Sequence, residues 1–592
     1  MNNPEHLYHK AFEAASQGNY ELALVFLGEL LSRHPAIAKA HHLSATCCMR
    51  MGDFQRALQH ARSAVEYAPD HPPSRWVLGI CLAQTDQHDL AIEEFKMGCG
   101  LAPQEADGWN NLGHALLEKR RFEEAEAALR RGLSITNKMP NLSVGLAWCL
   151  VQTGRADEAL AVLAAQDAST PRELAVLYAR TVMSLYSEKV NAAALAQLHR
   201  EYASRVESQL PARPIRPSSP GPADAERPLR VGLLSPDMYG HSVSRFVEPL
   251  LLHSDRDKIR FGVFSTNPMR DEITGRLDSM AGLWSEIFRL PDQMAVTEIR
   301  NQQLDIMIDL AGHMPMNRSY LLHHRPAVIT MSYIGYPHRT GYSGIDYRIV
   351  DSITDPPAEA DNSSSEKLLR LDPCFLCFMP AVEPPPIEPI DPAGSGPLTF
   401  GSYNNVAKFS PGLLDLWARI LKQTPGSRLR LKGFAFSDAS TRNHIAREFG
   451  RREIEPERVE MMGMIPVTRE HLASYGGVHV ALDTYPYHGT TTTCEALLMG
   501  VPVVTLAGSE HRSRVGVSLL TAVGTPELIA ANPDEYVKIA VELAKDRAKI
   551  AHYRDTLRAR ITSSPLMDGP GFCARFENPL RGVWRQACGA NP

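Results

Sequence analysis

The chain has 592 residues, enough for about three to five domains, and its 44% hydrophobic and 22% charged residues are typical of a globular protein. The formal net charge is −5 and no long basic stripe occurs, which argues against nucleic acid as the main partner. The N-terminus lacks the regions of a signal peptide, and no apolar run reaches transmembrane length. We therefore expect a cytoplasmic protein that has no membrane partner.

The first third of the chain repeats every 34 residues. Alanine recurs in one register, small residues fill a second, and proline occupies a third: Ala23, Ala57, Ala91, Ala125 and Ala159; Ala11, Ala45, Gly79, Gly113 and Ala147; Pro35, Pro69 and Pro103. The turn between helices falls at Gly18, Gly52 and Gly154, with Asp86 and Arg120 in the equivalent slots. This is the tetratricopeptide pattern, in which small residues let two helices approach closely and proline ends the second helix.

The repeats predict an α-solenoid over residues 1–168, followed by a helical cap over 169–210. Stacked helix pairs form a curved array with a concave face. Such a face binds an extended polypeptide, packs a neighbouring domain or packs a second subunit in a homo-oligomer, and the pattern alone does not choose between these.

Two proline-rich linkers, 211–228 and 381–397, separate the rest of the chain into two α/β regions. In region 229–380 we expect strands at 229–235, 261–265, 304–310 and 327–333, with helices at 243–252 and 294–302. In region 398–592 we expect strands at 398–403, 428–432, 459–463, 478–483 and 501–506. Alternating strands and helices predict two Rossmann-like lobes, which bind ligands beyond the carboxyl ends of their strands. The last helix, 571–586, is expected to pack back across the lobes.

One segment of the second lobe predicts a phosphate site. The strand that ends at Asp483 is followed by a turn and by a helix that begins at Thr490–Thr493 and is closed by Gly500. A helix start carries unpaired N–H donors and positive partial charge, so it suits a phosphate. Glu495, near the first turn, can reach a ribose hydroxyl. The alternative interpretation is an ordinary N-cap with additional threonines.

The C-terminal two thirds resemble the O-GlcNAc transferase/SPINDLY family of glycosyltransferases, bacterial-type, with tetratricopeptide repeats before a two-lobed GT-B region. The matching segments span most of 229–585 and are 235–241, 309–313, 325–328, 334–337, 346–351, 403–408, 483–505 and 513–518. The run Gly489–Glu495 is closer to the SPINDLY-like branch than to the animal enzymes. The resemblance implies a GT-B fold for the two lobes.

The resemblance also implies roles for single residues. Lys408 would bind the donor diphosphate and stabilise the leaving group, and His241 would act near the acceptor hydroxyl as a general base. The other donor-binding residues that it implies are Asn405, His471, Gly489, Thr490, Thr491, Thr492, Glu495, Gly335, Tyr336 and Pro337. Asp309 and His313 are weaker candidates. Thr468 stands where the family has a lysine near the base, so base selectivity stays open.

No metal or other cofactor is expected. The one Asp-x-Asp triplet, Asp255–Asp257, lies in a polar stretch away from the matching segments, and we interpret it as a solvated turn. Cys374 and Cys377 form a lone C-x-x-C without a second pair, and we interpret them as small apolar residues. Lys408 and the helix start at 490–493 can replace a cation beside the diphosphate.

The predicted function is a protein O-glycosyltransferase that transfers a sugar from a nucleotide diphosphate to Ser or Thr hydroxyls with inversion. UDP-N-acetylglucosamine is the first candidate donor; GDP-fucose, or another activated sugar transferred to flagellin, remains open. A repeat scaffold that binds nucleotide without turnover is an alternative of a different class, and a nucleotide-sugar epimerase is a third.

Overall fold

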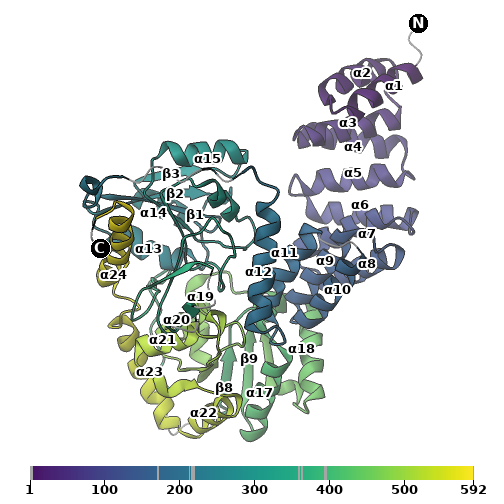
Figure 1. Cartoon of the computed structure of the whole chain (residues 1–592). Helices are drawn as coiled ribbons and strands as arrows, with labels where there is room; N and C mark the ends of the chain where they lie inside the picture. The colour runs from purple at the N-terminus through teal and green to yellow at the C-terminus, as the bar shows by residue number, and fades with distance from the viewer. Residues whose placement is uncertain are drawn as a thin grey trace. The chain divides into compact units, whose positions relative to one another are not determined.

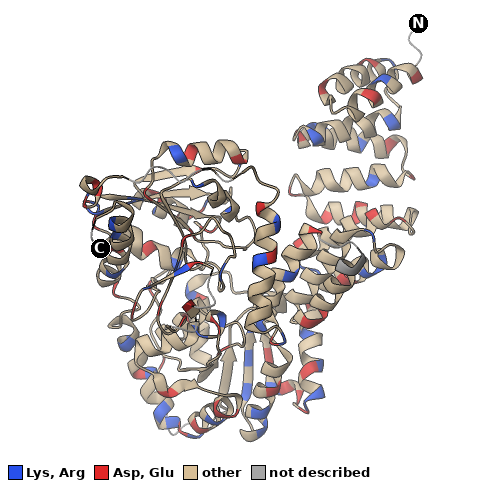
Figure 2. Ribbon diagram, viewed as in Figure 1, with Lys and Arg blue, Asp and Glu red and all other residues tan. Residues whose placement is uncertain are grey.

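The computed structural model of the chain describes residues 4–169, 173–212, 214, 220–357, 360–361, 365–391 and 396–590. Parts of both predicted linkers, 213, 215–219 and 392–395, lie outside the described residues. The chain divides into two compact units, residues 1–153 with 158–179 and residues 154–157 with 180–592. None of the described helices combines the length and the apolar character that a membrane span requires. Residues of both charge signs are interspersed along the helices (Figure 2).

The first unit is a stack of helix pairs (Figure 1). Its helices are α1 (Pro4–Ser16), α2 (Tyr20–Arg33), α3 (Ala38–Arg50), α4 (Phe54–Tyr67), α5 (Pro72–Ala83), α6 (His88–Leu101), α7 (Ala106–Glu118), α8 (Phe122–Ile135) and α9 (Pro140–Gln152), with most of α10 (Ala156–Ser169). This arrangement confirms the predicted tetratricopeptide solenoid.

Two registers of the repeat have direct structural causes. The turn residues adopt left-handed backbone conformations at Gly18, Gly52 and Gly154, and Asp86 and Arg120 adopt the same conformation without being glycine. The small register lies where the two helices of a pair meet. A Cβ added to Gly79 would lie 2.5 Å from the Phe95 ring, and one added to Gly113 would lie 2.5 Å from Leu129.

Helices continue after the repeats as α11 (Leu174–Met183) and α12 (Ala192–Glu207). The sequence led us to expect both as a cap of the solenoid, but α12 belongs to the second unit. Ala203 of α12 is part of the core of the first lobe, and His199 Nε2 lies 2.7 Å from the Tyr336 hydroxyl. Buried contacts with the lobe therefore hold this helix.

The first lobe is a seven-stranded parallel sheet in the order β3-β2-β1-β4-β5-β6-β7. Its elements are β1 (Leu229–Ser235), α13 (Ser244–His253), β2 (Ile259–Ser265), α14 (Glu272–Met280), β3 (Leu283–Glu286), α15 (Asp292–Asn301), β4 (Ile306–Asp309), β5 (Ile329–Ser332), β6 (Tyr347–Val350) and β7 (Lys367–Arg370). The sequence predictions missed β3, β6 and β7, which are four residues each.

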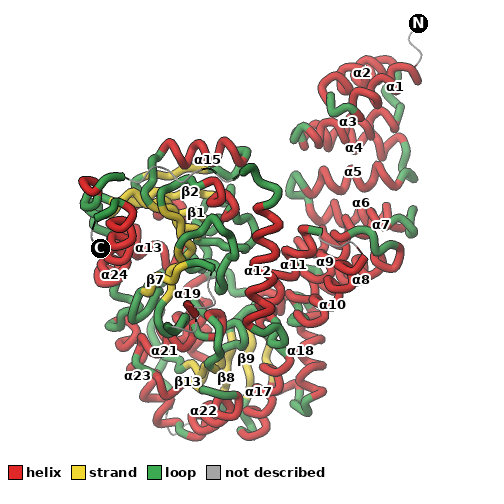
Figure 3. The backbone as a smooth tube through the Cα atoms, viewed as in Figure 1, coloured by secondary structure: helices red, strands yellow, loops and turns green. Residues whose placement is uncertain are grey.

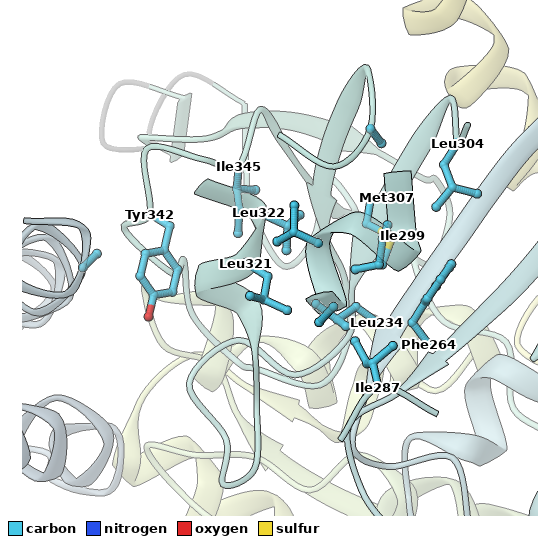
Figure 4. Packing of buried hydrophobic residues seen from close by; sticks show 14 residues of the cluster. Leu234, Phe264, Ile287, Ile299, Leu304, Met307, Leu321, Leu322, Tyr342 and Ile345 are labelled. Atoms are coloured by element: carbon cyan, nitrogen blue, oxygen red, sulfur yellow. The ribbon is translucent and has the colours of Figure 1, made fainter. Parts of the chain in front are cut away.

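The core of this lobe packs helix α15 and the segment 319–324 against the sheet. Leu234 and Met307 from the sheet meet Ile299, Leu321 and other apolar side chains in one buried cluster (Figure 4). Burial of such side chains stabilises the lobe by about 1.5–3 kcal/mol each. The cluster therefore fixes the strand ends from which the site loops leave.

The second lobe is a six-stranded parallel sheet in the order β10-β9-β8-β11-β12-β13. Its strands are β8 (Thr399–Ser402), β9 (Arg428–Lys432), β10 (Val459–Met462), β11 (Val480–Leu482), β12 (Val503–Leu506) and β13 (Ile529–Ala530). The helices are α17 (Pro411–Gln423), α18 (Ala439–Arg451), α19 (Thr468–Ala473), α20 (Thr491–Leu498), α21 (Val515–Val523), α22 (Pro533–Lys545), α23 (Arg547–Thr562) and α24 (Gly569–Ala587).

Both sheets lie inside their lobes, with helices outside them (Figure 3). The last helix, α24, leaves the second lobe and contacts α13 of the first. Arg581 of α24 donates to the backbone carbonyls of Ala225 and Lys258 at 3.0 and 2.9 Å. Two Rossmann-like lobes joined in this way confirm the predicted fold class.

Candidate functional site

A cavity of about 530 Å³ lies between the two lobes. From the first lobe it is lined by loops that follow β1, β2, β4, β5 and β7, and from the second by the loops that precede α17, α20 and α21. Its volume is within the range of small-molecule sites. The lining residues that sequence analysis had selected are His241, Gly335, Pro337, Asn405, Lys408, Thr490, Thr491 and Thr492.

Lys408 is held at this cavity by the second lobe. Asn405 caps the short turn 406–408 by accepting from the Ala407 N–H at 3.1 Å, so this residue also stabilises the loop that carries Lys408. Nζ of Lys408 donates to the His488 carbonyl at 2.7 Å and lies 4.1 Å from the Tyr487 ring centroid. Burial lowers the pKa of Lys408 to about 8, and the Asp483 carboxylate opposes this shift.

The start of α20 faces the same cavity. Thr490 makes no side-chain cap bond, and the hydroxyl of Thr491 is buried without a hydrogen-bond partner among the described residues. Thr492 donates to the Asn404 amide oxygen at 3.1 Å. The simple N-cap interpretation therefore fails, because the first threonine does not cap the helix. Unpaired donors here leave room for an oxygen-rich ligand.

The carboxylate of Asp483 stabilises the turn before α20 by hydrogen bonds. It accepts from the Gly489 N–H at 2.7 Å, the Thr484 N–H at 2.9 Å and the Thr505 hydroxyl at 2.8 Å. Gly489 is therefore a buried support of the loop, close to the cavity but not among its lining residues.

His471 and Glu495 lie beside the cavity, outside its lining. Nε2 of His471 is 2.9 Å from the Glu495 carboxylate, and Nδ1 is 2.8 Å from Nζ of Lys432. Burial lowers the pKa of Lys432, and the charge of Glu495 opposes this. Sequence analysis missed Lys432, although its place at the carboxyl end of β9 was a usable signal.

His241 follows β1, and its side chain is 39% exposed. Nδ1 lies 3.3 Å from the Val243 backbone nitrogen and 3.6 Å from the Asp237 carboxylate. The first contact favours Nδ1 as an acceptor and the second favours it as a donor. Burial raises the pKa of Asp237.

The loop 335–337 is only partly directed at the cavity. A Cβ on Gly335 would lie 1.7 Å from the Leu310 carbonyl oxygen, so glycine is required by packing within the lobe. The Tyr336 side chain is buried and contacts His199 of α12, and it does not line the cavity.

The two weaker candidates are buried supports. Asp309 accepts from the Gly312 N–H at 2.8 Å and the Ser319 hydroxyl at 2.7 Å, and burial raises its pKa to about 7. His313 is fully buried, and neither residue lines the cavity. Asp257 N–H donates to Asp255 in an exposed turn, as the sequence predicted.

Other lining residues were not selected from the sequence. Tyr186, from the segment between α11 and α12, stacks near Tyr487 with ring centroids 5.4 Å apart. His511, from the loop after β12, is paired with Asp355 of the first lobe. No sequence pattern links Tyr186 to Tyr487 or Asp355 to His511, because only folding brings these residues together.

The described residues contain no group of three or more His, Cys, Asp or Glu side chains placed to hold a metal ion. All ten cysteines are buried and reduced. Burial raises the pKa of both Cys374 and Cys377 to about 12.

Two parallel-sheet lobes around a cavity with an open helix start define the class, a GT-B fold preceded by tetratricopeptide repeats. Glycosyl transferase family 41 matches residues 213–378 and 394–576, and tetratricopeptide models match 48–106 and 116–181. The chain belongs to glycosyl transferase family 41.

Individual relatives agree with this assignment. The Arabidopsis thaliana protein named probable UDP-N-acetylglucosamine–peptide N-acetylglucosaminyltransferase SPINDLY is 40% identical over 369 residues, which are 62% of this chain and 40% of that protein. The tomato protein of the same name is 40% identical over 402 residues, 67% of this chain and 42% of that protein. The chain thus spans less than half the length of these relatives.

A solved structure of a Thermobaculum terrenum O-GlcNAc transferase mutant is similar along nearly the whole chain. It has a TM-score of 0.74 and 30% sequence identity, and the match covers 93% of this chain and 98% of that one.

Proposed function

We propose that this chain is a protein O-glycosyltransferase that transfers a sugar from a nucleotide diphosphate to Ser or Thr hydroxyls of a polypeptide. One observation carries the proposal: Lys408 and the uncapped start of α20 meet at one cavity between the lobes. An ammonium group and unpaired N–H and hydroxyl donors are the partners that a diphosphate requires. The relatives' names support UDP-N-acetylglucosamine as the first candidate donor.

The proposed reaction is a single in-line displacement with inversion at the anomeric carbon. The acceptor oxygen forms a bond to this carbon while the bond to the β-phosphate oxygen breaks. Negative charge develops on the departing diphosphate, where Lys408 and the Thr490–Thr492 segment lie ready to stabilise it. These groups supply the positive charge that a cation would otherwise provide, so the proposal includes no metal.

His241 is proposed to take the proton from the acceptor hydroxyl. Its half-exposed ring opens to the cavity, and the Asp237 carboxylate 3.6 Å away would stabilise the imidazolium that forms. His241→Gln should therefore lower kcat much more than it raises the KM for the donor.

The nucleoside is proposed to lie over the chain Lys432–His471–Glu495. Glu495 would accept from the ribose hydroxyls, and His471 would lie against the base. Lys432, in contact with His471, would supply a positive charge beside the base that Thr468 cannot supply. These three residues are proposed to determine whether UDP or GDP binds more tightly. GDP-fucose and other activated sugars remain alternative donors.

The solenoid is proposed to bind the polypeptide acceptor on its concave face, and the reaction is proposed to occur in the cytoplasm. The matching tetratricopeptide models support protein binding by this unit.

The decisive experiment measures nucleotide release with an acceptor protein present, after UDP, GDP and CMP have been ranked by thermal shift. Wild type should release nucleotide with acceptor, and Lys408→Ala should release far less. Equal nucleotide release by wild type and Lys408→Ala would refute the proposal that the chain is a transferase. A scaffold would bind nucleotide without turnover, and an epimerase would convert the free sugar nucleotide without acceptor.

A further inference from the structure

A buried histidine of the second lobe is part of the cavity wall and has no role in the mechanism above. His511 lies in the turn after β12, is 8% exposed and lines the same cavity as Lys408. Its Nδ1 is 2.5 Å from the carboxylate of Asp355, which follows β6 in the first lobe. This contact joins the two lobes behind the cavity.

The contact with Asp355 determines which ring nitrogen carries the proton. Burial lowers the pKa of His511, so its ring is neutral at neutral pH. Burial opposes ionisation of Asp355, but the hydrogen bond from the His511 ring and the charge of Arg348 hold its pKa below the usual value. An ionised carboxylate only accepts, so Nδ1 carries the proton. Nε2 is then an acceptor with a lone pair, and no described residue hydrogen-bonds to it.

The backbone next to His511 is tied to the proposed diphosphate site. The His488 N–H donates to the Arg512 carbonyl at 2.9 Å, and the His488 carbonyl accepts from Nζ of Lys408 at 2.7 Å. His511 therefore precedes Arg512, whose backbone is connected through His488 to Lys408, the residue proposed to bind the β-phosphate. The sugar of a nucleotide donor is attached to the β-phosphate, so a diphosphate at Lys408 would bring the sugar into the part of the chain's cavity that His511 also lines.

Apolar side chains also take part in the cavity lining. Phe375 lies 5.2 Å from His511 between ring centroids, and Leu376 and Val515 line the same cavity. A buried acceptor beside an apolar side chain discriminates strongly, because a ligand without the matching hydroxyl leaves it unpaired.

We propose that Nε2 of His511 accepts a hydrogen bond from a hydroxyl of the donor sugar. His511 is then a specificity-determining residue, and Asp355 is the positioning residue that fixes its tautomer. The inference rests on the proposed function, since it requires a sugar nucleotide in the cavity.

The test compares the Kd of the sugar nucleotide with the Kd of the free nucleotide, by calorimetry without acceptor protein. The probes are UDP with UDP-N-acetylglucosamine and GDP with GDP-fucose. His511→Phe keeps a planar ring but removes the acceptor, and Asp355→Asn presents an amide N–H to Nδ1 and so reverses the tautomer. His511→Phe should raise the Kd of the sugar nucleotide about 5- to 10-fold more than that of the free nucleotide. Asp355→Asn should do so by a smaller factor, because Nε2–H can still donate to the hydroxyl oxygen. His552→Gln, an exposed histidine of α23, is the matched control and should change neither.

A second measurement uses donors that lack one sugar hydroxyl. One of them should bind wild type about 5- to 10-fold more weakly than the parent, and this difference should disappear in His511→Phe. Equal weakening of free and sugar nucleotide in both variants would overturn the inference, as would a fall in kcat with unchanged donor Kd. If neither UDP nor GDP binds wild type, the proposed function itself fails.

Discussion

The affinity for a nucleotide diphosphate should fall as pH rises through 8, because one ammonium group changes its charge there. Burial lowers the pKa of Lys408 from its ordinary 10.5 to about 8 in the ligand-free protein. Lys408 is therefore charged below this pH and increasingly neutral above it. A bound diphosphate favours the charged form and raises the pKa again, so binding above pH 8 takes up a proton.

The magnitude follows from the same value. At pH 7 about nine in ten Lys408 side chains are charged, and at pH 9 about one in ten, so the Kd should rise about tenfold between these pH values. Binding at pH 9 should take up about 0.9 proton. Lys408→Met should bind about 10- to 100-fold more weakly at pH 7, since it lacks a charge-assisted hydrogen bond, and should lose this pH dependence.

Isothermal titration calorimetry between pH 6.5 and 9.5, in buffers of different ionisation enthalpy, measures both the Kd and the proton uptake. Ionisation of the nucleotide itself affects wild type and Lys408→Met alike and cancels in the comparison. A wild-type pH profile that is parallel to that of Lys408→Met would show that Lys408 does not contact the diphosphate.

Three further predictions use other parts of the site. Thr491→Val removes the hydroxyl that is buried without a described partner, so the ligand-free protein should unfold at the same or a higher temperature while the nucleotide Kd rises about 5- to 10-fold; unchanged nucleotide affinity would contradict this. Lys432→Met should break the contact with His471 and shift the ratio of UDP to GDP affinity, and a constant ratio would remove Lys432 from base recognition. Gly335→Ala should destabilise the first lobe by about 3 kcal/mol or more, because its Cβ would lie 1.7 Å from a backbone carbonyl oxygen. The matched control for Gly335→Ala is Gly275→Ala, at an exposed helix position with free space around an added Cβ, which should not destabilise the protein in the same thermal unfolding assay.

Periodicity was sufficient to predict the architecture. The 34-residue registers specify helix pairs because Gly79 and Gly113 leave space for Phe95 and Leu129 of the paired helix. The fully buried four-residue strands β4 and β5 were visible as apolar runs. The strands β3 and β7 were missed because they are only partly buried, and β6 was missed because Arg348 interrupts its apolar run.

The uncapped start of α20 and the lysine at 408 could also be selected from the sequence, since each lies in a local motif whose residue types suit a phosphate. Local chemistry did not show which of the selected residues face the cavity. The Tyr336 side chain contacts His199, and the Gly489 N–H donates to Asp483 within the loop before α20.

The order of elements and the residue types at the strand ends are properties of short segments, so the sequence by itself determined the solenoid, the two lobes and the phosphate-type motif. Only the tertiary structure decided that Asp355 fixes the tautomer of His511, that Tyr186 reaches Tyr487, and that α12 belongs to the first lobe. The contacts His511–Asp355, Tyr186–Tyr487 and His199–Tyr336 each join residues more than 100 positions apart. Such pairs leave no mark in a local pattern, because burial and chain topology bring them together only once both lobes have folded.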